Sequence, residues 1–313
     1  MDDMDQSLVH DVGDNPNEYF RFLHSRTLNT LNTNYLLPVD HDEVKRSEYH
    51  HRLVQFLFSG RNWVGPVKEA LQFGQHRRVL DLGTGSGLWA IDTADEFTRA
   101  EVIAIDLAPI QPEHVPPNCT FELCDLDEAP IPYPDSFFDF IHARSLHIGI
   151  RNYPRLLREV ARLLRPGGLV LLIEPTLHPC PAPAGKPPMH GWITLWDTYR
   201  KCLRRQNIDV TVPERLSELL SEAGAFESVI IREGNVPVGF WPKDPHSLSI
   251  GQLQWMDYDL LLPALRPLFL CSGLPPSSVD LLIKDAQNDL YNPPYDPSTR
   301  LHIAYATKRF TAP

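Results

Sequence analysis

The sequence predicts an α/β protein whose mostly parallel sheet carries helices on both faces. Three observations predict it. Short apolar runs alternate with helical patterns from about residue 78 onward, the first run ends in a glycine-rich turn, and acidic residues close three successive runs. Alternation of strands and helices favours a parallel sheet that is covered on both sides.

The expected elements follow from hydrophobic patterning. Asp40 and Glu43 form a predicted capping box for a helix that runs to about Phe58. A later helix carries its leucines on one face and is expected to stop at Pro166-Gly167-Gly168, with glycine as the left-handed cap. Strands are predicted at residues 78–82, 101–106, 120–125, 137–142, 169–173, 228–232 and 301–306. Helices are predicted at residues 88–97, 156–164, 192–205 and 213–223, with two more within 248–290.

Composition narrows the class of protein. The 313 residues are 42% hydrophobic and carry a net charge of −11, which suits an ordinary globular core and makes nucleic acid a poor partner. The acidic start lacks the apolar stretch of a signal peptide, and the apolar run near residues 260–270 is too interrupted to cross a membrane. Five cysteines without metal-ligand spacing indicate a reducing compartment. We therefore expect a cytoplasmic protein, with the nucleus as the alternative, that binds neither nucleic acid nor membrane.

Two regions stand apart from this alternation. Residues 1–75 are predicted to form an N-terminal helical segment, of which residues 1–39 could act as a lid through Tyr19, Phe20, Phe22 and Tyr35. Residues 76–313 form the predicted main domain. Six prolines between residues 175 and 188 indicate a semi-rigid loop that leaves the core and returns to it. Elements within about 176–225 and 245–292 are expected to form an inserted helical cap.

The strongest chemical signal is the turn Asp81-Leu82-Gly83-Thr84-Gly85-Ser86-Gly87, set between a strand and a helix. Glycines allow a sharp turn and close approach of a ligand, and the helix N-terminus adds free N–H groups. Alone, the turn could be a tight connection that binds nothing. Asp106 and Asp125, at the ends of the next two strands, could accept from ribose hydroxyls and an adenine amino group. The dinucleotide and P-loop patterns are both unmatched, because Leu88 follows the last glycine and no Gly-Lys-Ser/Thr is present.

This D-x-G-x-G-x-G form resembles motif I of the class I S-adenosylmethionine (SAM)-dependent methyltransferases. Further segments resemble the fungal LaeA-like group of that family, namely residues 79–92, 106–112, 115–118, 136–144, 165–168 and 236–244. The resemblance covers roughly residues 35–308. It implies a Rossmann-like sheet of seven strands, SAM as cofactor and S-adenosylhomocysteine as product. The cofactor-binding residues that it implies are Asp81, Gly83, Thr84, Gly85, Gly87, Trp89, Asp106, Leu107, Asp125, Leu126 and Ala143.

Catalytic candidates follow the fourth predicted strand. His147 lies past the strand and is the preferred general base, whereas His142, still inside it, could equally be a core histidine. His190 is a third candidate, after the proline loop. Arg144 could clamp a substrate carboxylate or form a structural ion pair. With no Asp/Asp/Asn set near the site, we predict methyl transfer without a metal ion.

A second group of side chains could bind the acceptor. Trp192, Trp196 and Tyr199 recur at helical spacing and form either an aromatic wall over an apolar acceptor or ordinary core packing.

Three functions remain open at this point. The leading one is O- or N-methylation of a small molecule in fungal-type secondary metabolism. The resemblance also allows a LaeA-like regulatory protein that acts through protein partners. A third is a cyclase that binds SAM without transferring the methyl group.

Overall fold

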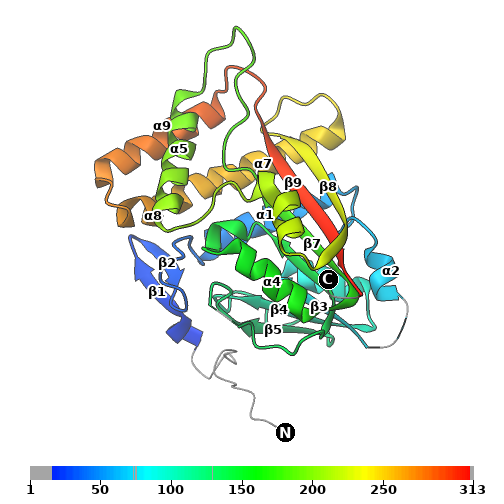
Figure 1. Cartoon of the computed structure of the whole chain (residues 1–313). Helices are drawn as coiled ribbons and strands as arrows, with labels where there is room; N and C mark the ends of the chain where they lie inside the picture. Colours follow the sequence, from blue (N-terminus) through cyan, green and yellow to red (C-terminus); the bar gives the residue numbers. More distant parts are fainter. Residues whose placement is uncertain (1–15, 73, 75, 129, 311–313) are drawn as a thin grey trace.

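The computed structural model describes residues 16–72, 74, 76–128 and 130–310. A sheet of seven strands forms the centre of the molecule, in the order β5-β4-β3-β6-β7-β9-β8 (Figure 1). The pairs among β5, β4, β3, β6 and β7 are parallel, and β9 runs antiparallel to both of its neighbours. The predicted mostly parallel, seven-stranded sheet is confirmed. Its strands are β3 (Arg77–Leu82), β4 (Ala100–Asp106), β5 (Cys119–Leu123), β6 (Phe138–Arg144), β7 (Leu164–Pro175), β8 (Phe226–Pro237) and β9 (Ser298–Lys308).

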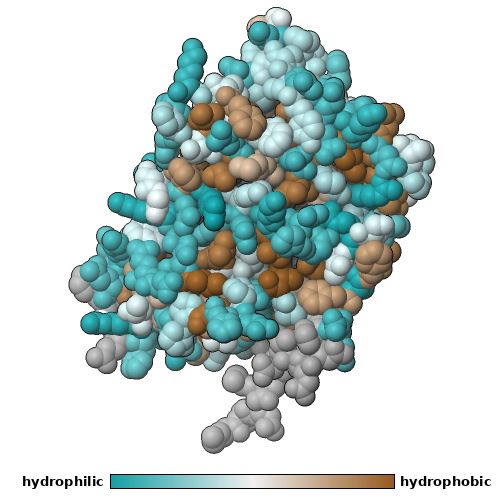
Figure 2. Space-filling view, turned by 180° about the vertical axis from the view of Figure 1, so that it is seen from behind, coloured by the Kyte–Doolittle hydropathy of each residue, from teal (hydrophilic) through white to brown (hydrophobic). Residues whose placement is uncertain are grey.

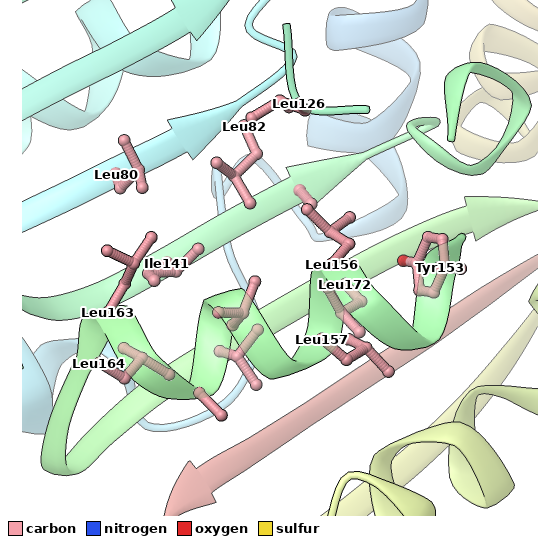
Figure 3. Packing of buried hydrophobic residues seen from close by; sticks show 14 of the residues in the cluster. Leu80, Leu82, Leu126, Ile141, Tyr153, Leu156, Leu157, Leu163, Leu164 and Leu172 are labelled. Carbon is pink, nitrogen blue, oxygen red and sulfur yellow. The ribbon is translucent and has the colours of Figure 1, made fainter. Parts of the chain in front are cut away.

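Helices cover both faces of the sheet because the central strands are apolar on both sides. Leu80 and Leu82 face one side, where they pack with α4 (Tyr153–Leu163) and α6 (Leu216–Glu222). Figure 3 shows leucines of α4 interleaved with those of the strands. Val79 faces the other side, toward α1 (His41–Leu57), α2 (Val67–Gln72), α3 (Leu88–Glu96) and α7 (Pro245–Ala264). Burial on both faces explains why these strands lack polar alternation.

A separate helical layer lies beyond one end of the sheet. Helices α5 (His190–Arg205), α8 (Arg266–Cys271) and α9 (Pro276–Tyr291) pack there with the second half of α7 around their own apolar core (Figure 1). Residues 176–189, all of them described, form neither helix nor strand, as their prolines predicted. Helix α6 and the short η3 (Pro213–Arg215), expected in the cap, do not belong to this layer, because α6 packs on the sheet.

Three element boundaries differ from prediction. Helix α4 ends at Leu163, and Leu164 already pairs with Phe138, so the Pro166-Gly167-Gly168 turn lies inside β7 and is not a helix cap. Residues 245–291 form three helices instead of two, since Pro267 in the first turn of α8 starts a new helix. Strands β8 and β9 pair with each other over most of their length, which extends both beyond their apolar runs.

The N-terminal region is less helical than predicted. A hairpin of β1 (Phe20–Leu23) and β2 (Arg26–Asn29) follows the short η1 (Pro16–Tyr19). Asp40 caps α1 as expected by accepting from the Glu43 backbone N–H, but the Glu43 side chain binds Arg46 instead of closing a capping box. Residues 1–15, part of the predicted lid, lie outside the described residues.

The molecular surface is largely hydrophilic on the face seen from behind (Figure 2). Figure 2 shows hydrophilic residues over much of one face, with hydrophobic residues visible between them in several patches. Within the described ranges, no helix is both long and apolar enough to span a bilayer.

Candidate active site

A cavity of about 980 Å³ opens at the carboxyl ends of β3, β4 and β6, and we call it the glycine-loop cavity. In open α/β sheets, the connections that leave neighbouring strands in opposite directions form a crevice at the carboxyl ends of the strands, and ligands bind there. The sheet side contributes Gly83, Thr84, Gly85, Asp106, Leu107, Ile110, Cys124, Asp125, Leu126, Arg144, Ser145, Leu146, Gly149 and Ile150. The N-terminal region contributes Tyr35, Pro38, Val39, Glu43, Arg46, Ser47 and His50.

The glycine loop needs its glycines for two distinct reasons. Gly87 has a φ of +81° at the N-cap of α3, and a Cβ there would lie 2.5 Å from the Phe121 ring. Gly83 has a φ of +69°, and a Cβ would lie 2.7 Å from Leu146 and protrude where the backbone borders the cavity. Behind the loop, Asp81 accepts from His142 Nδ1 at 2.7 Å, which anchors the end of β3 to β6. The loop therefore leaves its bare backbone open to a ligand.

Asp106 and Asp125 offer carboxylates to the same cavity. Asp106 accepts from the backbone N–H groups of Gly85 and Leu107, each at 2.7 Å. Burial nevertheless raises the pKa of Asp106 to about 6, because the backbone hydrogen bonds only partly offset desolvation. Asp125 accepts from the Asn32 side chain at 3.2 Å, and burial raises its pKa too. The N-terminal region thus reaches across to the third strand end.

One face of α1 carries the opposite wall. Glu43, Arg46, Ser47 and His50 all line the cavity at helical spacing. The Arg46 guanidinium bonds Glu43 on its own helix and Asp257 Oδ1 on α7 at 2.7 Å, which fixes α1 against α7.

Arg144, at the end of β6, differs from Arg46, the other cation that lines this cavity, in its lack of a carboxylate partner among the described residues. Within the described residues its guanidinium meets only the His51 ring, at 3.4 Å, and forms no ion pair. Burial lowers the pKa of Arg144 to about 10, which leaves it cationic at neutral pH. A half-buried cation without a carboxylate partner can bind the carboxylate of a ligand.

A second cavity, of about 740 Å³, adjoins the first, and we call it the aromatic cavity. Tyr35, Arg46, His50 and Ser145 line both cavities. The rest of its wall is mostly apolar and aromatic, formed by Leu37, Leu53, Leu57, Ile148, Pro175, Leu177, Trp196, Tyr199, Val236, Tyr258, Leu261 and Leu301. Its polar positions are Thr176, Gln254, Asp257, Thr299 and Arg300.

The three predicted catalytic histidines lie elsewhere. His147 is 0% exposed, and its Nδ1 bonds Glu174 at 2.7 Å inside the core. His142 is also buried and stacks on Trp89 with ring centroids 3.8 Å apart. His190 is exposed at the start of α5. In the described part of the chain, none of the three lines either cavity.

The remaining predicted residues divide into lining and supporting groups. Gly83, Thr84, Gly85, Asp106, Leu107, Asp125 and Leu126 line the glycine-loop cavity, as does Arg144. The lining does not include Asp81, Gly87, Trp89 or Ala143, which lie behind it within the described chain. Trp196 and Tyr199 line the aromatic cavity, whereas Trp192 packs edge-on against Trp196 and Tyr258.

Sequence reasoning missed the wall on α1 and its partner Asp257. Glu43, Arg46, Ser47 and His50 do recur at helical spacing, but a polar helix face usually points to solvent, so this pattern alone did not indicate a cavity wall. Asp257 offered no such signal, since its contacts to α1 are more than 200 residues away in sequence.

The fold and this site together define a class I SAM-dependent methyltransferase. Residues 49–226 match the family model described as a methyltransferase domain, and the chain belongs to that family. Within it, the chain is a member of the fungal LaeA-like group. It is 31% identical to the secondary metabolism regulator laeA of Coprinopsis cinerea, over 88% of this chain and 70% of that one. It is 29% identical to the methyltransferase pytC of Aspergillus terreus, over 72% and 67%.

Among solved structures, the chain is similar to phosphoethanolamine N-methyltransferase 2 of Haemonchus contortus. Sequence identity is 17%, the TM-score is 0.49, and the match covers 86% of this chain and 58% of that one. SAM is the cofactor, as predicted. The residues present fit it: a loop that a Cβ would obstruct, a half-buried carboxylate at Asp106 and a cation at Arg144.

Proposed function

We propose that this methyltransferase acts on a small molecule bound in the aromatic cavity, in fungal-type secondary metabolism, and releases S-adenosylhomocysteine. The observation that carries the proposal is the adjacency of the two cavities, which share Tyr35, Arg46, His50 and Ser145. A methyl donor in one cavity and an acceptor in the other would meet at these shared side chains. Holding two reactants in contact is itself worth several kcal/mol of barrier.

The glycine-loop cavity would hold SAM along its whole length. We assign the methionine part to the glycine loop, the ribose hydroxyls to Asp106 and the adenine amino group to Asp125. Arg144 would bind the methionine carboxylate, since it is the lining cation without an ion pair among the described residues. When bound, SAM supplies a methyl group already activated by its sulfonium charge.

The lining of the aromatic cavity favours an apolar, flat acceptor. Trp196, Tyr199 and Tyr258 are almost fully buried, so the aromatic side of the cavity lies within the protein. Burial raises the pKa of both tyrosines, which keeps their hydroxyls neutral and able to donate. Apolar walls with a few polar groups are typical of small-molecule sites. We expect this enzyme to work in the cytoplasm.

The test blocks the aromatic cavity without touching the SAM residues. Leu261→Trp should fill the cavity, whereas Leu281→Trp places the same side chain on an exposed position of α9. Purified proteins would be incubated with SAM and fractions of a metabolite extract, with S-adenosylhomocysteine release and product mass as readouts. We expect product from the wild type and from Leu281→Trp only. All three proteins should bind SAM with the same affinity in calorimetry. Equal turnover by Leu261→Trp would contradict the proposal.

A regulatory role through protein partners is the second candidate. Its support is the 31% identity, over 88% of the chain, to a relative described as a secondary metabolism regulator. For that role we expect a nuclear location. A pull-down with tagged protein should then recover a stoichiometric partner, and Leu261→Trp should not release it. Failure to recover any partner, combined with turnover of a metabolite, would remove this candidate.

A further inference from the structure

A histidine lies where the two cavities meet, and an aspartate of the aromatic cavity contacts it. On α1, the Nδ1 atom of His50 lies 3.1 Å from Asp257 Oδ2 on α7. Its Nε2 lies 3.1 Å from the Ser145 hydroxyl. Ser145 has a φ of 55°, in the left-handed region that side chains rarely adopt, as is common for residues held at functional sites.

The surrounding charges determine which nitrogen of His50 carries the proton. Asp257 also accepts from Arg46 at 2.7 Å and from Gln254 at 3.2 Å. The pKa of Asp257 is lowered from its usual value, because the Arg46 charge and the His50 contact together outweigh the opposing effect of burial. Asp257 is therefore ionised and accepts the Nδ1 proton of His50. The Nε2 lone pair is then left facing Ser145 and the cavities.

His50 is uncharged at neutral pH. Burial lowers the pKa of His50 below its usual value, and the nearby cations of Arg144 on β6 and Arg46 on α1 lower it further, against the opposing effect of Asp257. The neighbouring His51 ring faces Arg144 and Asp92. An uncharged imidazole with a fixed tautomer can take up a proton.

Building on the proposed function, we infer that His50 is the general base for a hydroxyl on an aromatic acceptor, with Asp257 as its positioning residue. In the transfer step the acceptor oxygen forms a bond to the methyl carbon while the S–CH₃ bond breaks, and the hydroxyl proton moves to His50 Nε2. The acceptor hydroxyl would replace Ser145 as the partner of Nε2. The products are the methyl ether and S-adenosylhomocysteine, and the proton later leaves to solvent.

A general base at His50 favours a hydroxyl acceptor over an amine, because a hydroxyl must lose a proton during methyl transfer. A neutral amine attacks through its own lone pair without losing a proton first, whereas a hydroxyl is a poor nucleophile until its proton is taken. Trp196, Tyr199 and Tyr258 surround the space beyond His50 with aromatic rings. An aromatic hydroxyl fits both features.

Ser145, His50 and Asp257 also lie in the order of an acyl-transfer triad, which is the main rival interpretation. That chemistry needs a free backbone N–H after the serine to bind an oxyanion. Here the Leu146 N–H donates to Glu174 Oε1 at 3.2 Å, so this donor is already taken. The arrangement favours a base that acts on a bound hydroxyl.

The experiment uses 7-hydroxycoumarin as a probe and 7-aminocoumarin as its amine counterpart. His50→Gln and Asp257→Asn are compared with wild type and with His246→Gln, an exposed histidine on α7 that serves as the matched control. The first readout needs no SAM: fluorescence distinguishes neutral from ionised 7-hydroxycoumarin bound to each protein across pH. The second is transfer of labelled methyl from SAM to each probe. Circular dichroism and urea unfolding report that each variant is folded, and calorimetry gives the SAM concentration that saturates it.

We expect wild type and His246→Gln to bind 7-hydroxycoumarin with its ionisation shifted to lower pH, and to methylate it. His50→Gln should abolish that shift and slow transfer by roughly 10²–10⁴-fold, even at SAM concentrations that saturate the variant. Asp257→Asn should slow transfer less and alter the pH profile. An ionisation shift or a rate that survives His50→Gln would overturn the inference, as would failure to bind or methylate 7-hydroxycoumarin. Methylation of 7-aminocoumarin alone would overturn it while leaving the proposed function standing.

Discussion

Replacing Asp106 by asparagine should separate SAM binding from protein stability. Burial raises the pKa of Asp106 from 3.8 to about 6, a difference of about two pH units or ~3 kcal/mol. The ionised carboxylate thus destabilises the folded protein relative to the neutral acid. For an acid with a raised pKa, this penalty is absent below the unfolded value and complete above the folded one. Asparagine is neutral at every pH and avoids it.

The substitution also has a cost. The amide introduced at position 106 would present its NH₂ group to one of the two backbone N–H groups that now donate to the carboxylate. That N–H group would lose its acceptor, which should lower the free energy of unfolding by about 1–3 kcal/mol. The net change in the free energy of unfolding should be small at pH 8. As the pH rises from about 5 to 8, however, the free energy of unfolding of the wild type should fall by about 1–2 kcal/mol relative to that of Asp106→Asn. Only the wild type has a carboxyl at this position that ionises over that range.

SAM affinity should change in the opposite direction. Loss of the charged acceptor for two ribose hydroxyls should weaken binding by about 1.5–3 kcal/mol, roughly 10- to 150-fold. In the wild type, affinity should fall as pH drops below about 6. In the variant it should be independent of pH in that range.

Urea unfolding and calorimetry at both pH values would measure these effects on the same samples. Alanine at Glu113, in an exposed loop, would serve as a control for removing an acidic residue. A stability difference that does not vary with pH would refute the reasoning about Asp106, and so would wild-type SAM affinity in the variant.

Three further predictions follow from other parts of the site. Gly87→Ala should lower the free energy of unfolding by about 1–2 kcal/mol or more, because φ is positive there and a Cβ would meet Phe121, and SAM affinity should fall with it; equal stability by urea unfolding would contradict this. Arg144→Met should weaken SAM binding by about 1.5–3 kcal/mol yet leave decarboxylated SAM unaffected, as calorimetry would show; equal losses for both ligands would remove the carboxylate assignment. Glu174→Ala should cost about 3–5 kcal/mol of stability, because it leaves the buried His147 unpaired, whereas a changed pH optimum without destabilisation would restore His147 as a catalytic candidate.

Local patterns carried the prediction of the sheet and of the cofactor. The glycine loop follows the end of β3, and the carboxylates at positions 106 and 125 lie at or just past the ends of β4 and β5, so neighbouring residues determine their placement. Parallel pairing then brings these ends to one edge of the sheet. Boundaries were less predictable, because Leu164 is held in β7 by pairing with Phe138 and not by its own preference.

The acceptor side was not readable in the same way. His147 resembled a catalytic base because it follows a strand at the expected edge, yet its ring turns into the core toward Glu174. His50 gave little sign of function in sequence, since its partners Ser145 and Asp257 come from the end of β6 and from α7. Which way a side chain points depends on the packing around it, which no local pattern records.

The sequence by itself determined the α/β class, the glycine loop and the choice of SAM over a dinucleotide, because each depends on residues close together in the chain. Only the tertiary structure decided that α1 forms the opposite wall of the cavity, that Arg144 is without a carboxylate partner in the described chain, and that His50 and Asp257 meet between two cavities. These features join segments up to 207 residues apart. They exist only once helix packing has brought those segments into contact.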